Sequence, residues 1–225
     1  MNLIVQKQLS TAAFKFLKDD FYKVYNSLGI TDHCDDHFKT FIDLYNQPGR
    51  YYHNLSHLYN FLQVANKELS TIKYPELFKI AIWLHDAIYI ASQKDNERQS
   101  NELFQQLFKS CLNSFQIEYV SDLILSTEGH KPQNKQTDCA LFLDIDLIIL
   151  AAPTSIYQSY SDAVWNEYKS SYPWSIYKLG RKKVLKAFLK RSFIYFTPSF
   201  QQKHEQKARY NIQLELNTTD GLNRV

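Results

Sequence analysis

The feature that most constrains the fold of this chain is how rarely it contains helix-breaking residues. Only 5 of its 225 residues are glycine and 6 are proline, and these are the residues that the tight turns of a sheet-rich protein require. Apolar residues recur instead at every third or fourth position over long stretches, which is the period of an amphipathic helix. The sequence therefore predicts an all-α fold.

Helical periodicity continues along the chain without a repeat, a linker or a low-complexity segment, so we expect a single domain over residues 1–225. Breaks fall where helix-stopping residues cluster, as at residues 46–49. Asn54 and Pro75 are typical of helix starts. The predicted helices span about residues 8–28, 35–45, 54–65, 75–91, 95–108, 115–126, 140–152, 155–169, 175–195 and 199–216.

Composition argues against several classes of protein. Hydrophobic residues make up 44% of the chain, which does not fit a disordered chain, and the formal net charge of +3 is mildly basic and does not by itself imply nucleic-acid binding. The longest apolar stretch, residues 80–84, is too short to span a bilayer, and the first residues do not resemble a signal peptide. Cys34, Cys111 and Cys139 are odd in number and widely spaced, so no disulfide framework is expected. We therefore expect a cytoplasmic protein with no membrane partner.

Acidic and imidazole side chains interrupt the two most apolar segments. His85 and Asp86 follow Ile-Ala-Ile-Trp-Leu and precede Ala-Ile-Tyr-Ile. Asp144 and Asp146 lie within Leu-Phe-Leu-Asp-Ile-Asp-Leu-Ile-Ile-Leu. Burial of a carboxylate in such surroundings is costly unless a cation compensates its charge. A shared divalent metal ion is the simplest compensation, because imidazole and carboxylate groups bind Mn, Mg, Ni, Co, Fe and Zn.

His57 adds an imidazole from a third segment of the chain. It lies one helical turn after His53, so the two side chains share a face of the predicted helix. Asp144 and Asp146 differ by about 200° around a helix, so only one of them is expected to point at the ion. The residues alone leave open whether His53 binds the metal, contacts a substrate or is an ordinary residue at a helix start.

The order of these residues resembles the H…HD…D signature of the HD superfamily. The match is closer to a bacterial branch of predicted metal-dependent HD phosphohydrolases, and it covers roughly residues 35–216. Two departures, Gln99 and Ile145, remove no ligand. The motifs that carry the resemblance are RxYHNxxH (Arg50 to His57), WLHDAIY (Trp83 to Tyr89), DNExxS (Asp95 to Ser100), DxDLxIL (Asp144 to Leu150) and ARxN (Ala208 to Asn211).

The resemblance implies an HD-domain helical bundle in which His57, His85, Asp86 and Asp146 bind the metal. It also implies hydrolysis of a phosphate ester or anhydride by a metal-activated water, whose pKa a bound ion lowers towards about 7. A nucleotide or related small phosphorylated molecule is the expected substrate. The expected catalytic residues are Asp86, Glu97 and His130, and the expected substrate-binding residues are Arg50, His53, Arg181 and Arg191.

Some of these residues have plainer explanations. His130 follows Gly129 and is equally typical of a polar turn, while Glu97 and Ser100 would also suit the solvated face of a helix. Arg209 and Asn211 either brace the site or pack a terminal helix.

Residues 178–191 contain seven basic and no acidic side chains. Nucleic-acid binding is possible there, but an amphipathic helix with a solvated basic face is favoured. In that helix Val184, Leu185, Phe188 and Leu189 would lie in the core.

Two other functions remain open. A di-iron oxygenase would need two further histidine ligands, which only His53 and His130 are placed to supply. A non-catalytic helical module would use the basic segment 178–191 to bind a partner.

Overall fold

The computed structural model describes residues 3–6, 8–30, 32–132 and 137–219, and these form α-helices and 3-10 helices without a strand. The all-α prediction is confirmed for these residues. The predicted domain of residues 1–225 also includes segments outside the described ones. In chain order the α-helices are α1 (Thr11–Ser27), α2 (Cys34–Tyr45), α3 (Leu55–Ala65), α4 (Pro75–Leu84), α5 (Asn96–Phe108), α6 (Ser114–Ser126), α7 (Thr137–Asp146), α8 (Thr154–Tyr168), α9 (Trp174–Lys190) and α10 (Pro198–Thr219), and the 3-10 helices are η1 (Leu69–Thr71) and η2 (Leu147–Ala151).

Local signals set several helix starts. The Ser10 hydroxyl accepts a hydrogen bond from the Ala13 N–H, and the Asn54 side chain accepts one from the Ser56 N–H. Asn113 and Gln116 form a reciprocal capping box at the start of α6. Such caps satisfy backbone donors that have no partner inside the helix, and each typically stabilises a helix by about 1 kcal/mol.

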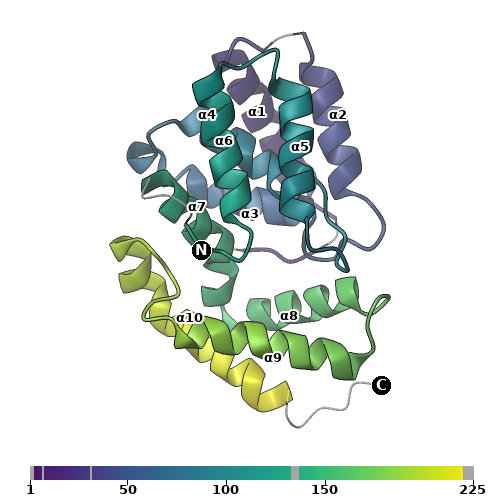
Figure 1. Ribbon diagram of the computed structural model, residues 1–225, viewed down its shortest axis with the longest axis vertical. Helices are drawn as coiled ribbons and strands as arrows, with labels where there is room; N and C mark the ends of the chain where they lie inside the picture. Colours follow the sequence, from purple (N-terminus) through teal and green to yellow (C-terminus); the bar gives the residue numbers. More distant parts are fainter. Residues whose placement is uncertain (1–2, 7, 31, 133–136, 220–225) are drawn as a thin grey trace.

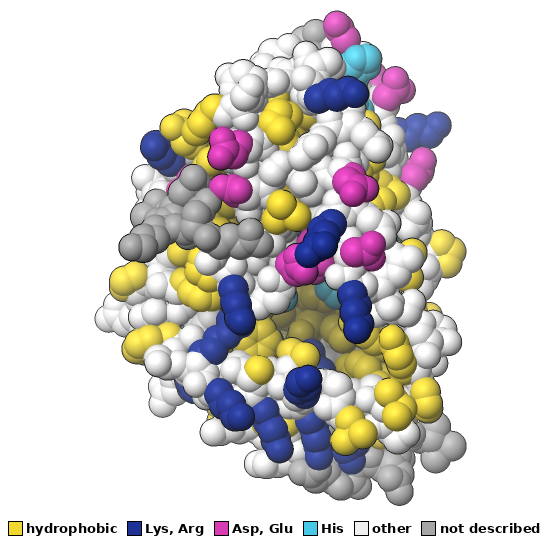
Figure 2. Space-filling model, in the orientation of Figure 1, with side chains coloured by type: hydrophobic (Ala, Val, Ile, Leu, Met, Phe, Trp, Pro, Cys, Tyr) yellow, Lys and Arg dark blue, Asp and Glu magenta, His cyan; other side chains and the backbone are white. Residues whose placement is uncertain are grey.

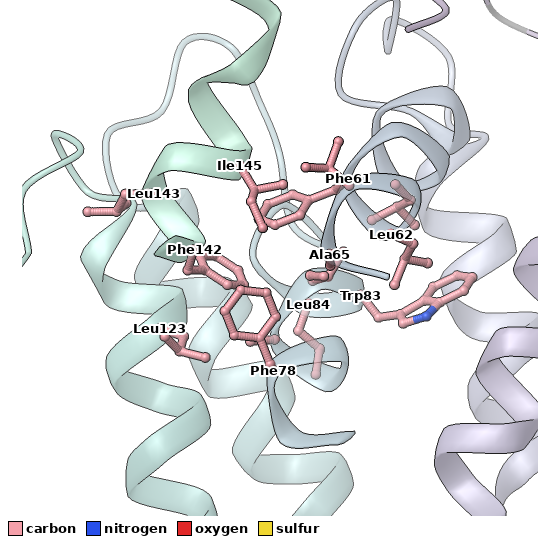
Figure 3. Close-up of a cluster of buried hydrophobic side chains, with 14 of the residues drawn as sticks. Phe61, Leu62, Ala65, Phe78, Trp83, Leu84, Leu123, Phe142, Leu143 and Ile145 are labelled. Carbon is pink, nitrogen blue, oxygen red and sulfur yellow. The ribbon is translucent and has the colours of Figure 1, made fainter. Parts of the chain in front are cut away.

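Helices α1 to α7 form the group that we call the upper bundle (Figure 1). Within it α4 packs against α1, α3, α5 and α6. Every residue from Leu77 to Leu84 is buried, which explains why this segment is apolar on nearly all sides. Its one charged side chain, Lys79, is paired with Asp20 at 2.6 Å. Its rings meet those of neighbouring helices: Phe78 and Phe61 both pack edge-to-face or tilted against Phe142 (Figure 3). Truncation of one such ring to alanine typically costs about 3–5 kcal/mol, so this cluster rigidly fixes α3, α4 and α7 relative to one another.

Helices α8, α9 and α10 form a second group below this bundle (Figure 1), and α10 packs against η2, α9 and α8. The side-chain amide of Asn211 donates to the carbonyls of Leu150 and Ala152, at the end of η2. The Arg209 guanidinium donates to the carbonyls of Leu189, Arg191 and Ser192, at the end of α9. The ARxN motif therefore braces helix ends in this lower group.

Three predicted helices end earlier than expected. The predicted helix over residues 75–91 ends at Leu84, and side chains from other elements take the backbone groups that a longer helix would use. The predicted helix over 175–195 ends at Lys190, where Arg209 takes the last carbonyls. The predicted helix over 140–152 changes to the tighter 3-10 form after Asp146.

No single described helix is long and apolar enough to cross a membrane. The segments 138–151 and 154–168 reach that length and apolarity only when taken together, and they are bent by 104° at the break between them.

Candidate metal centre

Three helices bring two imidazoles and a carboxylate to one point. His57 comes from the first turn of α3, His85 directly follows α4 as its C-cap residue, and Asp146 is the last residue of α7. Each contributes one atom to a group in which all ligand atoms lie within 4.8 Å of one another. The His57 Nε2 and His85 Nε2 atoms are 3.0 Å apart, and Asp146 Oδ1 lies 3.4 Å from the former and 3.7 Å from the latter. This buried group could hold a metal ion.

The orientation of His85 follows from the end of α4. Its Nδ1 lies 2.9 Å from the carbonyl oxygen of Ile82, three residues back in the last turn. Because a carbonyl only accepts hydrogen bonds, Nδ1 carries a proton and donates it to Ile82, and this bond turns Nε2 towards His57 and Asp146. Metal-binding histidines are typically oriented in this way by a carbonyl or carboxylate behind the ring.

Asp86 lies beside the group: its Oδ2 atom is 3.0 Å from His85 Nε2 and 3.5 Å from His57 Nε2. Burial alone would raise the pKa of this carboxyl, but the facing histidines hold it well below its ordinary value. The pKa of Asp146 is likewise lowered, despite burial, by His130, His57 and His85. Burial alone lowers the pKa of His57, yet the two carboxylates raise it to about 9. The negative charge of the two buried carboxylates thus needs compensation, by a proton on the imidazoles or by a metal ion.

Asp144 has a different role from Asp146. It is fully buried, and its carboxylate accepts hydrogen bonds from the backbone N–H groups of Phe196 and Thr197 at 2.6 and 2.7 Å and from the Thr197 hydroxyl at 2.6 Å. These donors lie just before α10, on the side of α7 away from the imidazoles. The structure therefore brings Asp146, and not Asp144, to His57 and His85.

His53 is held away from this group by a carboxylate that the sequence did not reveal. Its Nδ1 atom lies 2.8 Å from Oε2 of Glu167, a buried residue of α8. The other oxygen of Glu167 accepts hydrogen bonds from the backbone N–H groups of Tyr51, Tyr52 and His53 at 2.7–2.9 Å. The His53 ring stacks on Tyr89, with ring centroids 3.9 Å apart. Glu167 therefore fixes the turn that precedes α3.

Arg50, expected to bind substrate, is buried. Its guanidinium donates to the carbonyls of His53, Asp86 and Ala87 at 2.7–3.0 Å. These partners give Arg50 a positioning role for the His85–Asp86 segment, in place of the substrate contact expected from the sequence.

The DNExxS motif holds the same segment from the other side. The Ser100 hydroxyl bonds to both backbone groups of Ile88, and the Asn96 side-chain amide bonds to both backbone groups of Ile90. Both Asn96 and Ser100 are buried, which excludes the solvated helix face as the explanation for Ser100. Together with Arg50 they hold the backbone of residues 86–90 outside a regular helix.

A cleft of about 510 Å³ opens beside the candidate metal centre, between the upper bundle and helices α8 and α9. Figure 2 shows the hollow, with hydrophobic side chains inside it and charged ones at its edges. Asp86 and Asp146 lie at its floor, and Glu97 and His130 also line it. A site of this volume takes a small organic molecule.

Glu97 and His130 reach this cleft from the α5 and α6 sides. Burial raises the pKa of Glu97, and the negative charges of Asp86 and Glu128 raise it further. His130 Nε2 lies 3.1 Å from Asp146 Oδ2. His130 also has a φ of 48°, a left-handed conformation that is uncommon outside glycine. It is therefore not only a polar turn residue, because its ring contacts the carboxylate of the candidate centre.

The two arginines expected to receive phosphate have other partners. Arg181 lines the cleft, but it forms two hydrogen bonds with Glu215, at 2.9 and 3.1 Å, and one with the Tyr160 hydroxyl at 3.2 Å. Arg191 donates to the carbonyl of Gly129 at 3.2 Å and lies over the Phe188 ring. It is absent from the described lining of the cleft.

Residues 178–190 form part of the amphipathic helix α9, but one assignment within this segment was wrong. Leu185 and Phe188 are buried and Leu189 packs against the core, as predicted. Val184 was also expected in the core, yet it is 49% exposed and faces the cleft. The helical period predicts which residues are on the apolar face of α9, but not which part of that face packs against the core and which part lines the cleft. These two parts adjoin each other, so Val184 could not be told from Leu185.

Comparison of the chain with protein-family models, with curated proteins and with solved structures found no match.

Proposed function

We propose that this chain is a metal-dependent phosphohydrolase with an HD-type helical bundle, in which His57, His85, Asp86 and Asp146 bind a divalent ion. The observation that carries the proposal is the 3.0 Å approach of two imidazole Nε2 atoms between two carboxylates, at the floor of a cleft. The donor set of nitrogen and oxygen fits Mn, Fe, Co, Ni or Zn, and Mg to a lesser degree.

A bound ion would supply a hydroxide at neutral pH and polarise a phosphoryl oxygen. The remaining steps belong to side chains of this chain. Glu97, whose pKa is raised, is suited to take the proton of the attacking water. His130, held by Asp146 at the cleft wall, is placed to contact the phosphoryl group. The substrate is a small phosphorylated molecule, and the nucleotide expected from the sequence remains one candidate.

The proposal is tested by metal analysis of the purified full-length chain, combined with a phosphate-release screen in Mn²⁺, Mg²⁺, Ni²⁺ and Co²⁺. His85→Ala and Asp86→Ala should lose bound metal and turnover together. His33→Ala is the matched control, because His33 is an exposed imidazole at the start of α2. Full metal content and turnover in the His85 and Asp86 variants would refute the site.

One observation bears on the di-iron alternative. Asp146 presents Oδ1 to His57 and His85, and Oδ2 to His130, so its carboxylate could bridge two ions. His53, the other histidine that this alternative needs, has its Nδ1 engaged by Glu167. We therefore favour hydrolysis, and two equivalents of iron with a mixed-valent paramagnetic signal would favour the oxygenase.

A further inference from the structure

One wall of the cleft is an exposed apolar strip on α9. Ile176, Gly180 and Val184 are spaced four residues apart and all line the cleft, so they lie one above another on the same helix face. Ile176 is 52% and Val184 49% exposed. Exposed apolar side chains are ordinary when scattered, but here they gather beside the candidate metal centre.

Gly180 has no structural reason to be glycine. It lies in the interior of α9, where glycine weakens a helix relative to alanine. A Cβ atom added to it would meet no heavy atom within 4 Å, and its φ is not in the left-handed region. Neither packing nor backbone conformation therefore requires glycine here. What the missing side chain does is leave a notch between Ile176 and Val184, open to the cleft.

The other walls of the cleft are aromatic and carry little positive charge. Tyr168 and Tyr172 also line the cleft, and further apolar groups come from η2. Among the described lining residues, only Lys94 and Arg181 are lysine or arginine. Arg181 is already paired with Glu215. A polyphosphate would bring several negative charges into a cleft that also contains Glu97, and Lys94 is the one exposed lysine among its described lining residues.

We propose that the cleft binds a phosphate monoester whose ester group is an apolar chain or ring. The phosphate lies towards Asp86 and Asp146, and the apolar group lies along the strip of Ile176, Gly180 and Val184. This assignment of substrate class rests on the proposed phosphohydrolase function. The cleft volume of about 510 Å³ accommodates a ligand much larger than phosphate alone.

The test uses alkylphosphonates, which present a PO3 group like that of alkyl phosphates but resist hydrolysis because a P–C bond replaces the ester P–O bond. Methyl-, butyl-, hexyl- and octylphosphonate are titrated calorimetrically into the full chain in the presence of Mn²⁺. We expect the dissociation constant to fall about two- to fourfold for each methylene added beyond butyl, as for partial to full burial of a methylene. ATP in the same buffer should bind more weakly than hexylphosphonate.

Two substitutions locate the subsite. Gly180→Leu fills the notch and should abolish the dependence on chain length while leaving methylphosphonate affinity unchanged. Gly180→Ala should raise thermal stability and weaken octylphosphonate binding in part, so loss of fold cannot explain its effect. Leu179→Ala is the matched control, because Leu179 is 68% exposed and absent from the described cleft lining.

The outcomes separate this inference from the proposed function. Affinity that does not change with chain length, or a length dependence that survives Gly180→Leu, overturns the apolar subsite. Length-dependent binding without phosphate release from the matching alkyl phosphates refutes the hydrolase and leaves the subsite standing. Hydrolysis of short and long alkyl phosphates at equal kcat/KM, with equal binding, refutes the subsite and leaves the hydrolase.

Discussion

Replacement of Glu167 by alanine should destabilise the protein more than replacement of any exposed acidic residue. Glu167 is 5% exposed and accepts three backbone N–H bonds, from Tyr51, Tyr52 and His53, in addition to the bond from the His53 ring. A buried donor that loses its partner costs about 1–3 kcal/mol. Water entering the truncated site recovers part of this cost for some donors, so we expect a loss of about 3–5 kcal/mol for the four donors together.

The measurement is chemical denaturation of the full chain, supported by thermal unfolding. For a protein of this size a loss of 3–5 kcal/mol lowers Tm by about 6–20 °C. Glu167→Gln keeps one acceptor oxygen for the backbone donors but removes the charge that faces His53, so it should cost about half as much. Glu102→Ala, an exposed glutamate of α5, is the matched control and should change stability by less than about 0.5 kcal/mol.

The pH dependence of this loss has a predictable sign. Burial raises the pKa of Glu167, but His53 and the backbone bonds lower it below the ordinary 4.5. Its stabilisation is therefore complete above pH 4.5 and is lost as the pH falls through the lower folded-state pKa. Burial lowers the pKa of His53, but Glu167 and Asp86 raise it above 6.5. Its contribution is complete below pH 6.5 and is lost as the pH rises through the folded-state value.

The difference in stability between the wild type and Glu167→Ala should therefore be largest between pH 4.5 and 6.5. A loss below about 1 kcal/mol, or one that is constant from pH 4 to 9, would refute the account of Glu167 as the acceptor that fixes the turn before α3.

Three further predictions follow from the site. Asp146→Asn should lose bound metal, whereas Asp144→Asn should keep metal and lose about 1–3 kcal/mol of stability, since an amide cannot accept from all three donors; metal loss in the Asp144 variant alone would exchange their roles. Because the pKa of Glu97 is raised, kcat/KM should fall as the pH drops through a value above 4.5, and Glu97→Gln should remove that limb; an unchanged profile would exclude Glu97 as the base. Arg209→Ala should destabilise by about 2–4 kcal/mol, measured by denaturation, because three carbonyls lose a charged donor, and a change below about 0.5 kcal/mol would contradict its bracing role.

The sequence predicted the helices wherever one stretch of chain contains both the apolar period and the end signals. The starts of α3 and α4 at Asn54 and Pro75 depend on such local signals. That His85 would share a partner with one of Asp144 and Asp146 could also be anticipated, since polar groups within otherwise apolar segments need compensation. The choice of Asp146 and the addition of His57 were implied by the resemblance to the HD superfamily, and the structure does bring these two residues together with His85.

What could not be predicted depends on contacts between distant segments. Helix α4 stops at Leu84 because Arg50 and Ser100, from other parts of the chain, take the backbone groups that follow. Glu167 lies 114 residues beyond His53, and no local pattern marks it as a buried acceptor. Val184 shows the same limit, because periodicity reports an apolar face but not whether that face meets the core or a cleft.

The positions of Asp144 and Asp146 at the C-terminal end of α7 have a consequence for protein engineering. Asp144 accepts hydrogen bonds from the backbone just before α10, and Asp146, two residues later, lies with His57 and His85. The C-terminal helices and the candidate metal-binding residues therefore both depend on the last turn of α7. A chain truncated before residue 196 would leave Asp144 buried without its amide donors. We therefore expect such a truncation to unfold the last turn of α7 and displace Asp146, so that the upper bundle could not be produced alone as a minimal metal-binding unit.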